Sequence, residues 1–197
     1  MRILLIVSWL FVGLAGVIYH YGPGQEKMEL ERIDTMMQDA RASVQSENWA
    51  EAVEQFDAVL AELPAEKKTE ARGLTLEKAK AQMMAAELPK ARESLQTLLD
   101  EVRQDDEADP RFIAEVQSTL ANSQYYMTWL MRLEGRPEEE WRPEIEAARQ
   151  HYTQLAKTAD EIGDNHLATR SAEDLESSIR LARMELRQLQ ALPLPNQ

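Results

Sequence analysis

The sequence of 197 residues contains no cysteine. Disulfides, thiolate metal sites, a cysteine nucleophile and a lipid-modified N-terminal cysteine are therefore excluded. An oxidising compartment is compatible with this composition, because the chain has no thiol that such a compartment would oxidise.

Glycine and aromatic residues are also scarce, with 7 glycines and an aromatic content of 6%. No glycine-rich phosphate loop occurs, and most of the chain is built from alanine, leucine, glutamate, glutamine and methionine, which favour helices. We therefore predict an all-α protein. Its length and its hydrophobic content of 44% suit one small domain with a real core.

Positive charge is in short supply. There are 22 basic and 35 acidic residues, so the net charge is −13. A nucleic acid is not expected as a partner, because binding to phosphates requires a basic surface. We instead predict an acidic groove that favours basic or polar segments of a partner protein.

The N-terminus contains the one long apolar run, Ile3 to Tyr19, which has no charged residue. As a helix it would span about 26 Å, close to the thickness of a hydrocarbon core. We predict a transmembrane anchor over residues 1–21 and a linker over 22–25. The residues expected to contact the membrane are Trp9, Gly13, Ala15, Gly16, Tyr19 and Tyr21.

A cleaved signal peptide is the alternative, with a small-residue site near Gly13 to Gly16. For the anchor, Arg2 and the acidic remainder of the chain favour a cytoplasmic N-terminus, so that the soluble domain lies outside the cytoplasm. In the alternative, the domain would be secreted.

Apolar residues at helical spacing predict a hairpin of two helices over 26–64. A shift of 39 residues gives a second hairpin: Met37, Ala40 and Val44 fall on Leu76, Ala79 and Met83, and the second helices match in the same way. We predict helices over 67–86 and 88–102.

One half of the first hairpin resembles a known repeat. Asn48-Trp49, Ala52, Phe56 and Pro64 match the second helix of a tetratricopeptide repeat, although the period of 39 exceeds the usual 34. The resemblance implies a short α-solenoid of antiparallel hairpins, over residues 26–190, that binds proteins on the surface lined by the first helices.

The rest of the chain predicts a third hairpin and a final helix. Asp109 and Pro110 begin a helix that runs to about Leu133, and Pro143 begins the next, which ends at Gly163. The final helix, 166–190, carries a strict heptad stripe that either caps the solenoid or forms a dimeric coiled coil. Residues 191–197 are expected to be an extended tail.

Catalytic chemistry has little support in this sequence. The three histidines lack a convergent local motif, and the acidic turn Asp160, Glu161 and Asp164 beside His166 lacks the ligand pattern of a calcium loop. We expect capping and solvation there. The protein is predicted not to be an enzyme and to have no cofactor, metal or catalytic residues.

The expected function is therefore that of a membrane-tethered protein-interaction scaffold. Its alternative is a small accessory or assembly subunit of a larger membrane complex, held by its transmembrane helix. The partner and the oligomeric state do not follow from the sequence. The predicted partner-binding residues are Gln38, Arg41, Gln45, Lys78, Gln82, Asn122, Gln124, Tyr125, Tyr126 and Trp129.

Overall fold

The computed structural model describes residues 23–190, and within this range the chain forms α-helices and no strand. The helices are α2 (Pro23–Gln45), α3 (Trp49–Glu62), α4 (Lys68–Met84), α5 (Leu88–Arg103), α6 (Pro110–Leu133), α7 (Glu138–Ile162), α8 (Asn165–Arg183) and α9 (Leu186–Gln190).

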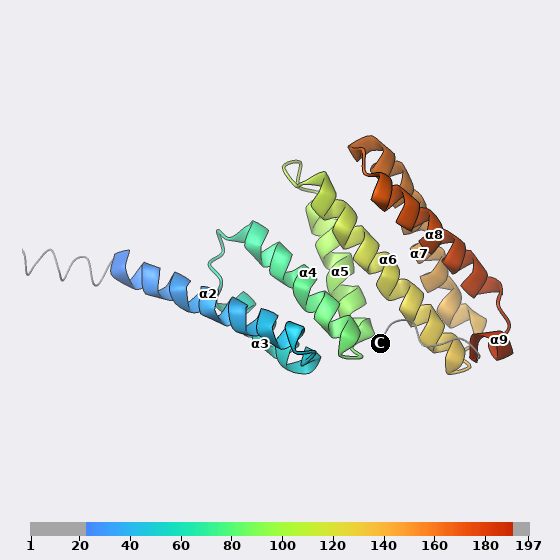
Figure 1. Cartoon of the computed structure of the whole chain (residues 1–197), viewed down its shortest axis with the longest axis horizontal. Helices are drawn as coiled ribbons and strands as arrows, with labels where there is room; N and C mark the ends of the chain where they lie inside the picture. The colour runs from blue at the N-terminus through green and yellow to red at the C-terminus, as the bar shows by residue number, and fades with distance from the viewer. Residues whose placement is uncertain (1–22, 191–197) are drawn as a thin grey trace, which may run out of the picture.

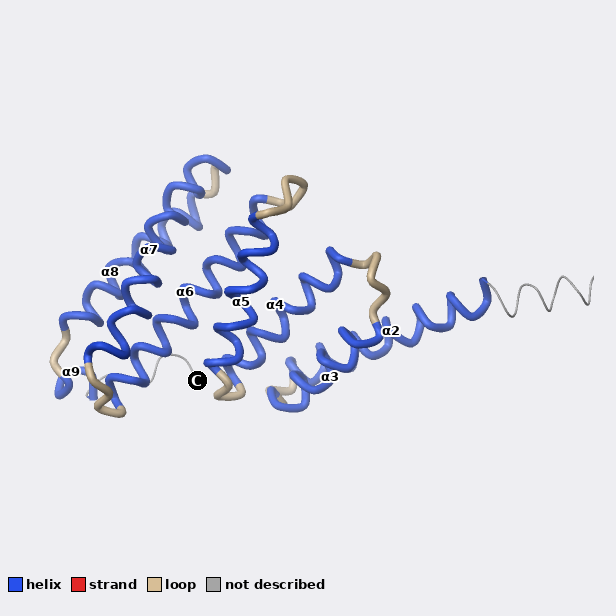
Figure 2. Tube along the Cα trace, turned by 180° about the vertical axis from the view of Figure 1, so that it is seen from behind, coloured by secondary structure: helices blue, strands red, loops and turns tan. Residues whose placement is uncertain are grey.

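Successive helices form hairpins that stack in a row. Each helix from α2 to α7 packs against the next helix in the chain. In Figure 1, α4, α6 and α8 lie on the side that faces the viewer, with α5 and α7 behind them, and Figure 2 gives the same order from behind. The prediction of an all-α, solenoid-like stack of helical hairpins is confirmed.

The predicted membrane segment, residues 3–19, and the tail, 191–197, lie outside the described residues, as do all six predicted membrane-contact residues. Among the helices of residues 23–190, none combines the length and the apolar composition that a membrane span requires. Helix α2 begins at Pro23, where the fixed φ of proline suits a first helical turn, so residues 23–25 of the predicted linker are helical.

The 39-residue correspondence is visible in the packing. Helices α3 and α5 begin at the equivalent residues Trp49 and Leu88. Small residues lie where helices approach closely and large ones fill the space between them, as a close-packed core requires. Three equivalent pairs are completely buried: Ala40 and Ala79, Ala52 and Ala91, and Phe56 and Leu95.

The turn that ends the first helix of each hairpin has the same backbone geometry. Glu47, Ala86 and Gly135 adopt left-handed φ angles of 59°, 62° and 71°. The amide after each donates to the carbonyl five residues earlier, which closes the helix end. These bonds join Asn48 to Ser43, Glu87 to Gln82 and Arg136 to Met131, at 2.9, 2.8 and 2.9 Å.

The second helix of the third hairpin begins earlier than predicted. Helix α7 starts at Glu138, and Pro143 lies inside it. Three glutamates occupy the first turn, where the helix dipole favours carboxylates. Arg142 also pairs with Glu138 across one turn. The charged residues just before Pro143, which lie outside both predicted helices, therefore belong to the start of α7.

The predicted final helix, 166–190, is divided into α8 and α9. Met184 has an extended backbone with ψ of 142°. Arg132 on α6 donates from its guanidinium to the carbonyl oxygens of Leu181 and Met184. A continuous helix would use these carbonyls internally. The contact with α6 thus favours the end of α8 at Arg183, which the periodicity of the sequence does not predict.

The heptad stripe of α8 is only partly buried. Ala172 on the stripe is exposed and Ile179 is half-buried, whereas Ser171, Ser178 and Leu181 are buried. Small serines let α8 approach its neighbours closely. Because α8 packs against α7, it covers that end of the stack, as the capping interpretation predicts.

Candidate partner-binding groove

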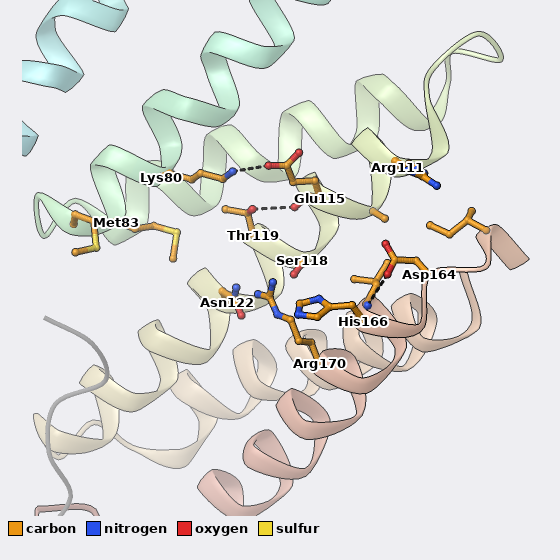
Figure 3. A pocket seen from close by; sticks show the side chains of 14 residues that line it. Lys80, Met83, Arg111, Glu115, Ser118, Thr119, Asn122, Asp164, His166 and Arg170 are labelled. Atoms are coloured by element: carbon orange, nitrogen blue, oxygen red, sulfur yellow. Dashed lines mark hydrogen bonds and ion pairs between the residues drawn. The ribbon is translucent and has the colours of Figure 1, made fainter. Parts of the chain in front are cut away.

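A groove of about 480 Å³ lies between α4, α6 and α8, the first helices of their hairpins. Figure 3 shows it with the 14 side chains that line it. On the α6 side, Ala114, Ser118 and Asn122 follow one another at four-residue spacing and so lie on one face of the helix. Their small size leaves room between α6 and its neighbours.

Part of the lining of the groove is apolar. Met83 and Met84 from the end of α4 line it, and Met84 is 46% exposed. Ile162 and Leu167 contribute further apolar surface from the junction of α7 and α8. The groove therefore combines apolar contact surface with polar groups, as ligand-binding sites commonly do.

Ion pairs between first helices stop where the groove opens. Arg41 on α2 pairs with Glu77 on α4 at 2.8 Å, and Lys80 on α4 pairs with Glu115 on α6 at 2.6 Å. Lys80 follows Arg41 by 39 residues, so the two cations are equivalent. Glu115 follows Glu77 by 38 residues. The same step from Lys80 leads to Ser118 on α6, which has no charge to pair with α8.

Each of the free polar groups of the groove includes a hydrogen-bond donor. Asn122 uses its amide oxygen to accept from the hydroxyl of Tyr152 at 2.7 Å, which leaves its NH₂ group available. Arg170 on α8 forms no ion pair with any residue of 23–190. In the close-up, Ser118, Asn122, His166 and Arg170 lie together, whereas Arg111 is apart at the start of α6 (Figure 3).

Both carboxylates of the groove already have partners. Glu115 holds the ion pair with Lys80, and Asp164 caps α8 by accepting from the amide of Leu167 at 2.9 Å. Against these two carboxylates the groove has three cations, Lys80, Arg111 and Arg170. The side chains that line this groove therefore carry one more positive than negative charge, although the whole chain carries −13.

Buried polar contacts hold α6 against α7 behind the groove. The amide nitrogen of Gln117 donates to the carbonyl of His151 at 3.2 Å and to Gln154 at 3.0 Å, and Arg103 donates to Gln117 at 3.0 Å. Burial, followed by the charge of Arg103, lowers the pKa of His151. Tyr152 is buried, and burial raises the pKa of its hydroxyl. This hydroxyl therefore remains protonated and donates to Asn122.

A half-buried carboxyl group lies one turn beyond Arg170 on α8. Burial raises the pKa of Asp174, and Arg170 reduces this effect only in part.

Tyr125 and Tyr126 on α6 form an edge-to-face pair with ring centres 5.7 Å apart, and burial raises both of their pKa values.

Of the predicted partner-binding residues, only Asn122 lines the groove. Gln82, Gln124 and Trp129 are 4%, 2% and 4% exposed, so they are not accessible to a partner in this structure. Trp129 packs with Ile145 in a core cluster. The others lie on partly or fully exposed helix surface outside this groove: Gln38, Arg41, Gln45, Lys78, Tyr125 and Tyr126.

The polar residues of the groove that were missed as partner-binding candidates include Lys80, Ser118, His166 and Arg170. Lys80 could have been found by applying the 39-residue shift to the candidate Arg41. No sequence pattern indicates His166 or Arg170, because their position in the groove depends on how α8 packs beside α6.

The acidic turn before α8 behaves as a helix cap, as the bonding of Asp164 shows. Within residues 23–190 there is no group of three or more histidine, aspartate or glutamate side chains placed to hold a metal ion. The groove offers directed donors and apolar surface, which suits recognition of a ligand by binding.

No protein-family model matches this chain, and a comparison with curated proteins gives no match either.

Proposed function

We propose that this protein is a membrane-tethered scaffold that binds a segment of a partner protein in the groove between α4, α6 and α8. The observation that carries the proposal is the groove itself, with about 480 Å³ of open space, exposed methionine and uncommitted polar side chains. Stacked helical hairpins commonly use the surface of their first helices in this way.

The repeats are proposed to be tetratricopeptide-like. Support comes from the equivalent buried alanines, the aromatic Phe56 and the shared left-handed turns at Glu47 and Ala86. The longer period of 39 and the much longer third hairpin make these repeats irregular members of that architecture.

The tether is the predicted transmembrane segment, residues 3–19. It would confine the groove to the membrane surface and so raise its effective concentration toward membrane-bound partners. In the proposed orientation, the N-terminus is cytoplasmic and the helical domain lies outside the cytoplasm.

The second candidate is an accessory or assembly subunit of a larger membrane complex, held by its transmembrane helix. Gly13, Ala15 and Gly16 favour it, because small residues let two membrane helices approach closely. In this case the groove would be dispensable for assembly.

Matched variants of the full-length protein separate the two candidates. Ser118→Trp fills the groove, and we expect it to abolish co-purification of the partner from native membranes. Gln150→Trp, at an exposed site on α7, is the steric control and should retain the partner. Loss of the partner with Gly13→Leu/Gly16→Leu, but not with Ser118→Trp, would favour the accessory subunit.

A further inference from the structure

We infer that the groove binds an acidic segment of its partner, with a carboxylate held by Ser118, Asn122, His166 and Arg170 (Figure 3). This inference rests on the proposed function and names the chemistry of the ligand. It reverses the expectation of a basic or polar partner segment, which follows from the overall charge.

The four donors form two pairs that belong to different helices. Ser118 and Asn122 are one turn apart on α6, and His166 and Arg170 are one turn apart on α8. Side chains four residues apart on a helix are neighbours. A carboxylate between the helices would thus meet a hydroxyl and an amide on one side and an imidazole and a guanidinium on the other.

The hydrogen bonds and ion pairs that already exist in the groove favour a ligand with negative charge. The two carboxylates of the groove are occupied, Glu115 by Lys80 and Asp164 by the start of α8. An entering lysine or arginine would have to share a carboxylate that already has a partner, Glu115 or Asp164. An entering aspartate or glutamate would gain charge-assisted hydrogen bonds, which are about twice as strong as neutral ones.

The acidity of the whole molecule does not overrule these local groups. At physiological ionic strength, charges separated by more than about 8 Å in solvent are largely screened from one another. The donors in the groove would be in direct contact with the ligand. The chain's net charge therefore slows the approach of an acidic segment more than it weakens the final contact.

The methionines next to the donors add a second requirement. Met83 and the 46% exposed Met84 line the same groove, and methionine adapts to apolar groups of different shapes. The segment that fits best therefore carries an apolar side chain close to its acidic one.

Three synthetic ten-residue peptides, in which leucine alternates with glutamate, glutamine or lysine, test the inference on the full-length protein in detergent micelles. Binding is measured by fluorescence anisotropy and by NMR of ¹³C-labelled methionine methyl groups. We expect the glutamate peptide to bind at least about tenfold more tightly than the glutamine peptide, as hydrogen bonds to a charged group imply. It should shift the methyl signals of Met83 and Met84, whereas those of Met36 and Met37 on α2 should not move.

Arg170→Gln should weaken binding of the glutamate peptide about tenfold, which is the loss expected for one charge-assisted bond. Lys157→Gln is the matched control, because it removes the same charge from an exposed site on α7 outside the groove. An equal effect of both variants would assign the preference to the long-range field and overturn the inference. Equal or tighter binding of the glutamine or lysine peptide would overturn it as well.

Capture of the native partner separates this inference from the proposed function. If Ser118→Trp and Arg170→Glu both lose the partner, both proposals stand. If only Ser118→Trp loses it, the groove binds the partner but not through an acidic segment. If neither variant loses it, the proposed function itself fails.

Discussion

A single carboxyl group on α8, that of Asp174, is half-buried, and burial raises its pKa. The folded state therefore keeps this proton up to a higher pH than the unfolded state does. The group's contribution to stability falls as the pH rises from its unfolded pKa, about 3.9, through its higher folded pKa. At neutral pH the ionised carboxylate opposes folding.

Asp174→Asn should accordingly raise the melting temperature at pH 7, by about 1–2 °C for a chain of this size, because the amide carries no charge to desolvate. The difference should shrink as the pH approaches 4. Circular dichroism melts of the two proteins across this range provide the measurement. Asp39→Asn, the same chemical change at an exposed site on α2, is the control. A lower melting temperature for Asp174→Asn at pH 7 would mean that attraction to Arg170 outweighs the cost of burial.

At the scale of one helix, the end of α8 depends on a side chain from α6. Arg132 donates to two carbonyls at the end of α8, and its guanidinium also lies 4.8 Å from the centre of the Trp141 ring. Leu189 of α9 is fully buried in the cluster that contains Trp129. Arg132 therefore joins α6, the end of α8 and Trp141 on α7 at one point.

Arg132→Met keeps much of the apolar stem and removes the donors. We expect it to destabilise the fold by about 1.5–3 kcal/mol, the range for hydrogen bonds to a charged group. Thermal unfolding measures this loss, and faster tryptic cleavage at Arg183 or Arg187 would show that α9 detaches. Arg136→Met, which removes an exposed ion pair with Glu140, should change stability by less than about 1 kcal/mol. Equal effects of the two variants would contradict the role of Arg132.

At the scale of the whole molecule, the charge is unevenly distributed. The chain carries −13, yet the groove between the first helices has more cations than carboxylates. Many of the exposed cations of the described stack are paired across helices or turns, as Arg41 and Lys80 are. Such exposed pairs contribute little to stability. They do decide which groups remain free to meet a partner.

The predicted anchor is also tested on the whole protein. We expect the full-length chain to fractionate with membranes, to require detergent for release and to retain its N-terminal residues in intact-mass measurements. Removal of residues 2–21 should leave the helical stack folded and release it into the aqueous fraction, because the proposed anchor is then gone. A mature product that begins near residue 17 would instead show a cleaved signal peptide.

Local patterns in the sequence are sufficient to predict the helical hairpins. The periodicity of Ala52 and Phe56, the cap at Asp109 and the left-handed glycine at Gly163 act within a few residues, so they can be recognised without knowledge of the fold. The 39-residue shift between the first two hairpins was also visible, because equivalent contacts between helices require equivalent side chains.

Which polar residues are accessible to a partner depends on the tertiary structure. Gln82 and Gln124 look like surface residues in the sequence but are buried, since each helix turns one face to its neighbours and polar residues do not reveal which face that is. The division of the final helix at Met184 requires Arg132 from α6. The groove likewise exists because α8 brings His166 and Arg170 beside Ser118 and Asn122, residues that are far apart in the chain.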